Sequence, residues 1–385
     1  MDEGLRQTLS RRGFLGLGLG SAASATGAYL LGQSAQASAP PVKMAHTDHD
    51  SGGHGAGMKE MLVGAVDHQR NGFDPMHLLV DWDYGTLVED SKTGVPVREY
   101  QVDAGDVEIE IAPGIFFPAW AYNARVPGPT IRCTEGDQLR IHFANYGSHP
   151  HTMHFHGFHP AEMDGVEGEH RGAILPGEDF TYEFDADPFG CHLYHCHAVP
   201  LKRHIHKGMY GAFIIDPQAG RPPAREFMMV MNAFDTNFDS ANEIYAVNTV
   251  GHEFMHRPIP VMTGELIRIY LINVVEFDLI NSFHLHGNFF DYYDTGTTLQ
   301  PTLRTVDTIM QAQGQRGILE FRFRWPGRFM FHAHVSEFAE LGWMGFFNAV
   351  KPADFNAALA EVGLDEEWDY KGTNGSTISQ RSLAK

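Results

Sequence analysis

An internal repeat limits what this chain of 385 residues can fold into more than any other feature of its sequence. Residues 136–145 (GDQLRIHFAN) match residues 264–273 (GELIRIYLIN), and three more pairs of segments match in the same order. These further pairs are 154–157 with 284–287, 180–184 with 319–323, and 195–197 with 332–334. The matched segments are short and rich in β-branched and aromatic residues, which is typical of strands. Four matches in one order predict two copies of one β-domain.

The predicted fold class is therefore all-β, with two β-sandwich domains. Strand-like sequence begins near Tyr100, and the Pro- and Gly-rich stretch 217–223 is the best candidate for a linker between the two copies. We place the first domain at residues 99–217 and the second at residues 224–351.

Residues 1–37 resemble a twin-arginine signal peptide. Arg11 and Arg12 precede a Gly-, Ala- and Leu-rich stretch, and a small-residue cleavage site follows at residues 35–37. The stretch is only weakly apolar, which favours cleavage over retention as a membrane anchor, although the sequence does not decide between them. The expected destination is the periplasm or the outside of the cell.

Two further segments flank the repeat. Residues 38–98 are expected to be a flexible linker and N-terminal extension, and whether His46, His49 and His54 in it bind copper is left open. Residues 352–385 are expected to form an acidic C-terminal tail with one short helix near 353–362.

The composition excludes some partners and leaves one disulfide question open. The net charge of −20 would repel nucleic acids and anionic membranes, so neither is expected as a partner once the signal has been cleaved. Three cysteines exclude a disulfide-rich scaffold. Cys133 and Cys191 could form a disulfide in an oxidising compartment or remain two buried thiols.

Four His-x-His pairs stand at corresponding places in the two copies. Residues i and i+2 of a strand point to the same side, about 6.6 Å apart, so each pair directs two imidazoles toward one cavity. Neutral imidazole binds copper, zinc, iron and nickel, so the pairs predict a metal site without naming the metal. The eight histidines are His154, His156, His195, His197, His284, His286, His332 and His334.

Cys196 narrows the choice of metal. It stands between two of these histidines, and its sulfur points to the opposite side of the expected strand. A thiolate, two histidines and a weak axial methionine form the ligand set of a blue copper electron-transfer site, for which we assign His151, His204 and Met209. His206, on the same expected strand as His204, is the alternative, and the spacing to Met209 favours His204.

These motifs resemble the copper motifs of multicopper oxidases such as laccases and ascorbate oxidase. Residues 126–132 (VPGPTIR) are similar to a segment of their cupredoxin domains, and the resemblance covers about residues 100–350. It implies two cupredoxin-like Greek-key β-sandwich domains and four coppers per chain. The type 1 copper would be held by His151, Cys196, His204 and Met209, the type 2 copper by His154 and His284, and the type 3 pair by His156, His195, His197, His286, His332 and His334.

The second copy departs from this pattern. Asn281, Ala333, Phe338 and Trp343 occupy the places of the four type 1 ligands, so the second domain is expected to contribute only to the trinuclear cluster. The chain thus looks like a two-domain multicopper oxidase. Enzymes of this kind form homotrimers in which the halves of the cluster meet between subunits, and the same assembly is expected here.

Two carboxylates are candidates for the proton relay that oxygen reduction needs. Asp164 follows the first His-x-His-Gly motif in a context that resembles the family's acidic residue near the type 2 copper. Glu337 follows His334 by three positions, where some family members carry a relay glutamate. A solvated surface acid is the alternative for each.

The leading functional hypothesis is a laccase-like oxidase that takes electrons from a phenolic or other small donor and reduces O2 to water. A copper-containing nitrite reductase, which shares the two-domain trimer and the long spacing from Cys196 to His204, is the nearest alternative. The presence of His197 and of all four histidine pairs favours the oxidase. A copper-resistance or electron-transfer cupredoxin protein is a third reading, and the reducing substrate cannot be inferred from the sequence.

Overall fold

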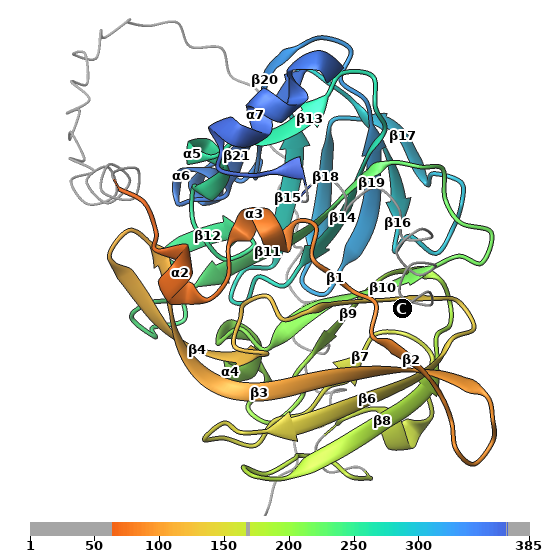
Figure 1. Ribbon diagram of the computed structural model, residues 1–385. Coiled ribbons are helices and arrows are strands. Elements are labelled where there is room, and N and C mark those ends of the chain that lie inside the picture. Colours follow the sequence, from red (N-terminus) through yellow and green to blue (C-terminus); the bar gives the residue numbers. More distant parts are fainter. Residues whose placement is uncertain (1–63, 167–169, 367, 369–385) are drawn as a thin grey trace, which may run out of the picture. The chain divides into compact units, whose positions relative to one another are not determined.

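The computed structural model describes residues 64–166, 170–366 and 368, all of which belong to one compact unit, residues 51–385 (Figure 1). The predicted signal peptide, His46, His49, His54 and the chain after residue 368 lie outside the described residues. No helix in the described part of the chain is long and apolar enough to span a membrane.

The first copy of the repeat folds into two sheets, and the N-terminal extension adds β1, β2 and the start of β3 to them. The described part of that extension is therefore not the flexible linker expected from the sequence, because its strands pair with the first copy and most of its apolar side chains are buried. One sheet has the strand order β1-β5-β10-β9-β7, and the other has the order β2-β3-β6-β8 with β4 paired to β3. The strands are β1 (Trp82–Asp83), β2 (Thr86–Glu89), β3 (Pro96–Ala112), β4 (Ile115–Tyr122), β5 (Thr130–Thr134), β6 (Gln138–Asn145), β7 (His154–Phe155), β8 (Asp179–Asp185), β9 (Gly190–His195) and β10 (Tyr210–Asp216).

The second copy repeats the arrangement. Its sheets have the orders β13-β21-β20-β15-β18 and β12-β11-β14-β19-β16-β17, so β13-β21-β20-β15 corresponds to β5-β10-β9-β7 of the first copy. The strands are β11 (Arg225–Phe234), β12 (Ile244–Val247), β13 (Ile259–Met262), β14 (Ile267–Asn273), β15 (Ile280–Leu285), β16 (Phe290–Asp294), β17 (Leu303–Val306), β18 (Thr308–Ala312), β19 (Arg316–Phe321), β20 (Gly327–His332) and β21 (Met344–Val350). The predicted all-β class is confirmed.

The core consists of three apolar clusters. One lies within the first copy, one joins the second copy to Met76, Leu79 and Val80 of the N-terminal extension, and the third takes side chains from both copies. Strand β11 explains the third cluster, because all ten of its residues are buried. Phe227 and Met229 point into the core of the second copy, whereas Met228 and Val230 point into the shared cluster. Strand β11 is thus covered on both faces, by the core of the second copy on one and by the cluster that both copies share on the other.

The described helices are all short and lie in connections. They are α2 (His68–Asn71), α3 (Pro75–Leu78), α4 (Leu201–His206), α5 (Glu253–His256), α6 (Ser336–Glu340) and α7 (Phe355–Glu361), with 3-10 turns η1 (Ala161–Met163) and η2 (Pro352–Asp354). The prediction that His204 and His206 lie on a strand is wrong, because both residues lie in α4. Leu201 and Ile205 are four positions apart, which places both on one face of a helix, and this spacing prevails over the alternation of His-Ile-His.

Cys133 and Cys191 are free buried thiols, which decides between the two possibilities left by the sequence. Both pair with β10 but from opposite sides, Cys133 opposite Ile215 and Cys191 opposite Ile214. Two strand spacings separate them, about 9.6 Å, which is too far for a disulfide.

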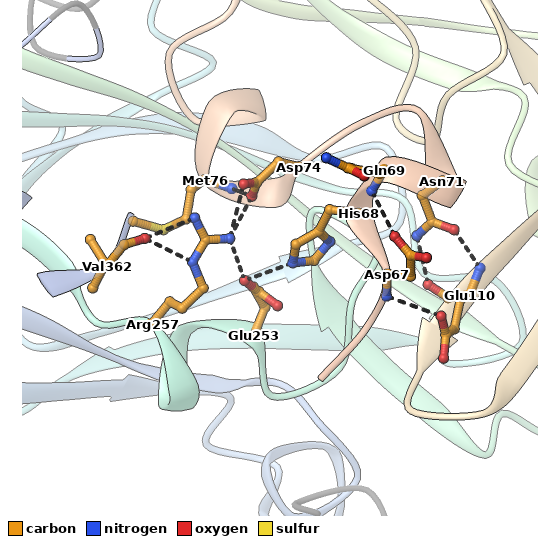
Figure 2. Close-up of polar contacts among 10 residues, drawn as sticks. All are labelled: Asp67, His68, Gln69, Asn71, Asp74, Met76, Glu110, Glu253, Arg257 and Val362. Atoms are coloured by element: carbon orange, nitrogen blue, oxygen red, sulfur yellow. Dashed lines mark hydrogen bonds and ion pairs between the residues drawn. The ribbon is translucent and has the colours of Figure 1, made fainter. Parts of the chain in front are cut away.

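A half-buried arginine ties the N-terminal extension to the second copy (Figure 2). Arg257 donates to both carboxylate oxygens of Asp74, at 2.8 and 2.9 Å, and to Glu253 Oε1 at 3.0 Å. It also donates twice to the carbonyl oxygen of Val362, after α7. His68, in α2, lies 3.2 Å from the same Glu253 oxygen. One guanidinium thus joins the extension, α5 and the segment after α7.

This cluster predicts that the extension loosens as the pH rises. Burial by itself lowers the pKa of His68, but the hydrogen bond and charge of Glu253, with the charge of Asp74, outweigh burial and the opposing charge of Arg257, so the pKa is raised. The protonated form stabilises the fold below the ordinary pKa of 6.5, and this contribution is lost as the pH rises through the folded pKa. Urea unfolding of wild type and His68→Gln should differ by about 1 kcal/mol near pH 6 and converge near pH 9. A difference that is constant with pH would contradict the assignment.

Candidate metal centres

Three predicted ligands of the type 1 copper meet inside the first copy. His151, Cys196 and His204 are 0%, 0% and 2% exposed. Cys196 Sγ lies 3.2 Å from His204 Nδ1 and 3.9 Å from His151 Nδ1, and the two nitrogens are 3.3 Å apart. Lone pairs that face one another in a buried space repel unless a proton or a cation lies between them. A thiolate and two imidazoles are ligands that suit copper, so the donor set fits the metal.

The backbone around this centre places the fourth predicted ligand. Met209 is fully buried, and its amide donates to the carbonyl of His204 at 3.1 Å. The amide of Cys196 donates to the carbonyl of Met209 at 3.0 Å. The chain therefore closes a tight loop from Cys196 through α4 to Met209. His206 points elsewhere, since its Nε2 accepts a hydrogen bond from the amide of Asp235 at 3.0 Å, so of the two candidates only His204 faces Cys196.

Thr152 links this centre to the neighbouring histidines. Its amide donates to Cys196 Sγ at 3.3 Å, and its hydroxyl accepts from the amide of His197 at 2.9 Å. The amide contact stabilises a thiolate, since it places a donor against negative charge. Ser282 repeats the second bond in the other copy, with the amide of His334 donating to its hydroxyl at 2.8 Å. A hydroxyl residue directly after the first type 1 position is the signal that the sequence analysis missed.

Four of the eight cluster histidines meet at the end of the first copy. His154 of β7 pairs in register with His195 at the end of β9. His156 Nε2 and His195 Nε2 are 3.2 Å apart, so two ring nitrogens converge on one point, an arrangement that suits a shared metal ion. Burial, with neighbouring imidazoles among the lesser causes, lowers the pKa of His156 to about 3, so the ring is neutral at pH 7. His197 completes the set, with its ring 5.3 Å from that of His154.

The other four histidines repeat this arrangement in the second copy. His284 of β15 pairs in register with His332 at the end of β20, and the Nε2 atoms of His286 and His332 are 2.9 Å apart. His334 lies 5.1 Å from His284, ring centre to ring centre. His286 and His334 are exposed, so this set lies open at the surface of a single chain. Ring contacts among the described residues join each histidine to others of its own set.

Oxygen atoms behind the rings fix which nitrogen is free for a metal. His154 Nδ1 lies 2.9 Å from the carbonyl of Asp164 and 3.0 Å from its Oδ1. His284 Nδ1 lies 3.0 Å from the carbonyl of Asp307 and 2.9 Å from Thr308 Oγ1. An Nδ1–H that donates to such acceptors leaves Nε2 with its lone pair directed at the metal. Asp307 and Thr308 have no motif, and only the pairing of β15 with β18 brings them to His284.

The two predicted relay carboxylates are placed differently. Asp164 touches His154, as described, and its Oδ1 is also 3.6 Å from His159 Nε2. Glu337 is exposed on α6, and among the described residues its carboxylate has no hydrogen bond or ion pair to a cluster histidine. The role of each in proton transfer stays a prediction.

Arg316 is a further residue at the first histidine set that the sequence analysis missed. It lies on β19 of the second copy, and its guanidinium is 3.4 Å from His156 Nδ1 and 3.4 Å from His192 Nδ1. With these histidines it lines a cavity of about 500 Å³. The second copy thus places a cation beside the histidines of the first. Arg316 and His156 are 160 residues apart in the sequence, and no motif predicts their contact.

The second copy keeps the backbone of the type 1 centre but not its ligands. Ala333 donates its amide to the carbonyl of Trp343 at 3.1 Å, and Trp343 donates to the carbonyl of Phe338 at 2.9 Å, as Cys196, Met209 and His204 do in the first copy. Trp343 is fully buried, and Phe338 stacks on Tyr245 with the ring centres 4.0 Å apart. With Asn281 at the remaining position, this place offers no thiolate or imidazole.

Comparison with known proteins identifies the family. Two family models, both described as multicopper oxidase, match residues 105–220 and 221–352. This chain belongs to the multicopper oxidase family. A solved structure described as a multicopper oxidase is 57% identical to this multicopper oxidase, covers 74% of this chain and all of its own, and superposes with a TM-score of 0.72.

Curated relatives of this multicopper oxidase include two kinds of copper enzyme. The copper-containing nitrite reductase of Neisseria meningitidis serogroup A is 30% identical over 247 residues, which are 57% of this chain and 61% of that protein. Laccase-9 of Arabidopsis thaliana is 40% identical over 104 residues, 26% of this chain and 17% of that protein. The chain spans between 32% and 61% of the length of the long-matching curated relatives. Family membership and fold are thus established, and the relatives do not decide between the two reactions.

Proposed function

We propose that this multicopper oxidase takes single electrons from a phenolic or other small donor at a type 1 copper and reduces O2 to water at a trinuclear cluster. The observation that carries the proposal is the presence of two sets of four converging histidines and one buried group of a cysteine and two histidines. Copper, when bound, supplies one-electron transfer at the first centre and four-electron reduction of O2 at the cluster.

The chain supplies a short covalent path between the two kinds of site. Cys196 is bonded through the backbone to His195 and His197, two proposed cluster ligands. His195 Nδ1 also lies 2.9 Å from the carbonyl of Cys196, so its N–H donates to that oxygen and shortens the route. The corresponding contact in the second copy, His332 Nδ1 to the carbonyl of Ala333 at 2.6 Å, orients a ring where there is no thiolate. The asymmetry supports electron entry through the first copy alone.

Asp164 supports a proton-handling role at the type 2 position. Its carboxylate accepts from His154 Nδ1 and lies within reach of His159, so a proton can be held at Oδ1 beside the cluster. Asp164 is partly exposed, which allows exchange of that proton with solvent.

We propose that three chains close a ring, with the first histidine set of one chain facing the second set of the next. Each set alone offers four imidazoles, and eight are needed to hold three coppers. Exposed apolar side chains accompany both sets: Phe158, 68% exposed, lines the cavity beside His154 and His156, and Met310, 59% exposed, lies on β18 opposite Ser282, two positions before His284. Apolar surface around unfinished metal sites is what a closed heterologous interface would cover.

A copper nitrite reductase is the second candidate, since relatives of that name match 57% of the chain. A carrier of electrons alone would need neither histidine set.

We further propose export by the twin-arginine route, because residues 1–37 resemble a twin-arginine signal peptide.

Copper content and turnover test the proposal together. The purified holoprotein should contain about four coppers per chain and consume O2 with a phenolic donor, without reducing nitrite. Two coppers per chain with nitrite turnover would establish the reductase instead. One copper without either activity would leave an electron carrier.

A further inference from the structure

The type 1 centre is closed to any donor. None of His151, Cys196, His204 and Met209 is more than 2% exposed in the single chain, so a donor molecule cannot touch a ligand directly. Electrons must therefore cross at least one other side chain.

One indole fills the space between this centre and the surface. Trp120, on β4, has its ring centre 4.8 Å from that of His204 and 5.5 Å from that of His151. The ring of His149, which is partly exposed, lies 4.3 Å from the same indole, centre to centre. The exposed guanidinium of Arg203 lies 5.2 Å from the same indole. The indole thus contacts both the buried ligands and the groups that meet solvent.

We propose that Trp120 is the electron-entry residue, carrying each electron from a donor docked at His149 and Arg203 to the type 1 centre. This inference rests on the proposed oxidase function. One electron leaves the donor and is taken up by cupric copper, which becomes cuprous. A phenolic donor departs as its radical, and its proton goes to solvent. The indole has the same oxidation state before and after the transfer.

The charges around the ring decide how the indole acts. Arg203 and the Lys207 ammonium, 5.6 Å from the ring centre, both face its π system. Two cations stabilise the electron-rich ring and oppose the formation of a positive indole radical. Trp120 therefore acts as a bridge across which the electron passes, and not as a site that is itself oxidised. Another aromatic ring should serve almost as well.

The second copy provides a matched control. In the pairing of β3 with β4, Trp120 stands opposite Asp106, and in the pairing of β11 with β12, Tyr245 stands opposite Ala233. The two aromatic residues occupy equivalent places, and Tyr245 covers Phe338 as Trp120 covers His204. Tyr245 thus has the packing role of Trp120 without a copper ligand beneath it.

Anaerobic stopped-flow reduction of the copper-loaded protein by a phenolic donor tests the proposal. Trp120→Leu should keep the blue absorption but slow the bleaching of that band about tenfold or more, whereas Trp120→Phe should stay within about threefold of wild type. Tyr245→Leu should bleach at the wild-type rate. His149→Leu, which alters only the surface side of the indole, should also slow bleaching, so the proposal remains testable if Trp120→Leu loses its colour.

Wild-type bleaching in Trp120→Leu would overturn the proposal, as would wild-type bleaching in His149→Leu if Trp120→Leu has lost its colour, or equal slowing in Tyr245→Leu. Reoxidation of the fully reduced protein by O2 should be unchanged in all variants. A wild-type protein without blue absorption or oxygen uptake would instead refute the proposed oxidase, which keeps the two failures distinct.

Discussion

Replacing Cys196 with serine should remove the blue absorption and lower donor-driven oxygen uptake by at least about a thousandfold, the scale on which loss of an essential group acts. Serine has nearly the same shape, but its hydroxyl stays protonated at neutral pH and is a hard, weak ligand for copper. The buried pair His151 and His204 would then lack the sulfur that lies 3.9 Å from His151 Nδ1 and 3.2 Å from His204 Nδ1. The electron path to His195 and His197 would also lose Cys196 Sγ, the atom at which it begins.

The variant should keep the cluster. The histidine rings of the first set are held by strand pairing of His154 with His195 and by oxygen acceptors behind the rings, and neither depends on the sulfur. Copper content should therefore fall from about four to about three per chain, and oxygen should still reoxidise a chemically reduced cluster.

Cys133→Ala is the matched control, because this thiol is equally buried but lies on β5, away from the histidines. It should stay blue and active at a stability cost of about 1 kcal/mol. A Cys196→Ser protein that remains blue would show that the thiolate ligand has been assigned wrongly.

The sequence predicted the fold class and the meeting of the histidines because both follow from strand geometry and repetition. His154 and His195 stand in separate motifs, yet their equivalents His284 and His332 show that the chain places them alike twice. A repeat of this kind carries information on tertiary contacts, since each copy must return to the same sandwich. The residues assigned to the type 1 centre came instead from the neighbours of Cys196 and from the resemblance to multicopper oxidases, because the second copy lacks all four of them.

Residues that belong to no sequence motif could not be predicted as part of the site. Asp307 and Arg316 approach the histidines only through strand pairing and through packing of one copy on the other. Cys133 and Cys191 are not bonded because β10 lies between their strands, and the order of strands in a sheet cannot be predicted from local sequence. In α4 the alternation of His-Ile-His favoured a strand, and the local spacing of apolar residues was the better guide.

Mixing two inactive chains should restore activity if the cluster is completed between neighbours. His156→Ala breaks the first histidine set and leaves the second intact, and His332→Ala does the reverse. Each homotrimer should fall to background, since no interface would join two complete sets. Co-expressed chains with two different affinity tags allow trimers that contain both variants to be isolated.

Every such mixed ring has one interface at which the intact first set of one chain faces the intact second set of its neighbour. Activity should therefore return to about a third of the wild-type value per trimer, with blue absorption unchanged throughout. A mixture of His156→Ala with His195→Ala chains is the control, because both lesions fall in the first set and every interface stays broken. If the first mixture is as inactive as the control, each chain must complete its cluster by itself, and the proposed ring is wrong. Recovery in the first mixture alone would mean that oxygen reduction belongs to the assembly, because a single chain holds the thiolate centre but only unjoined halves of the cluster.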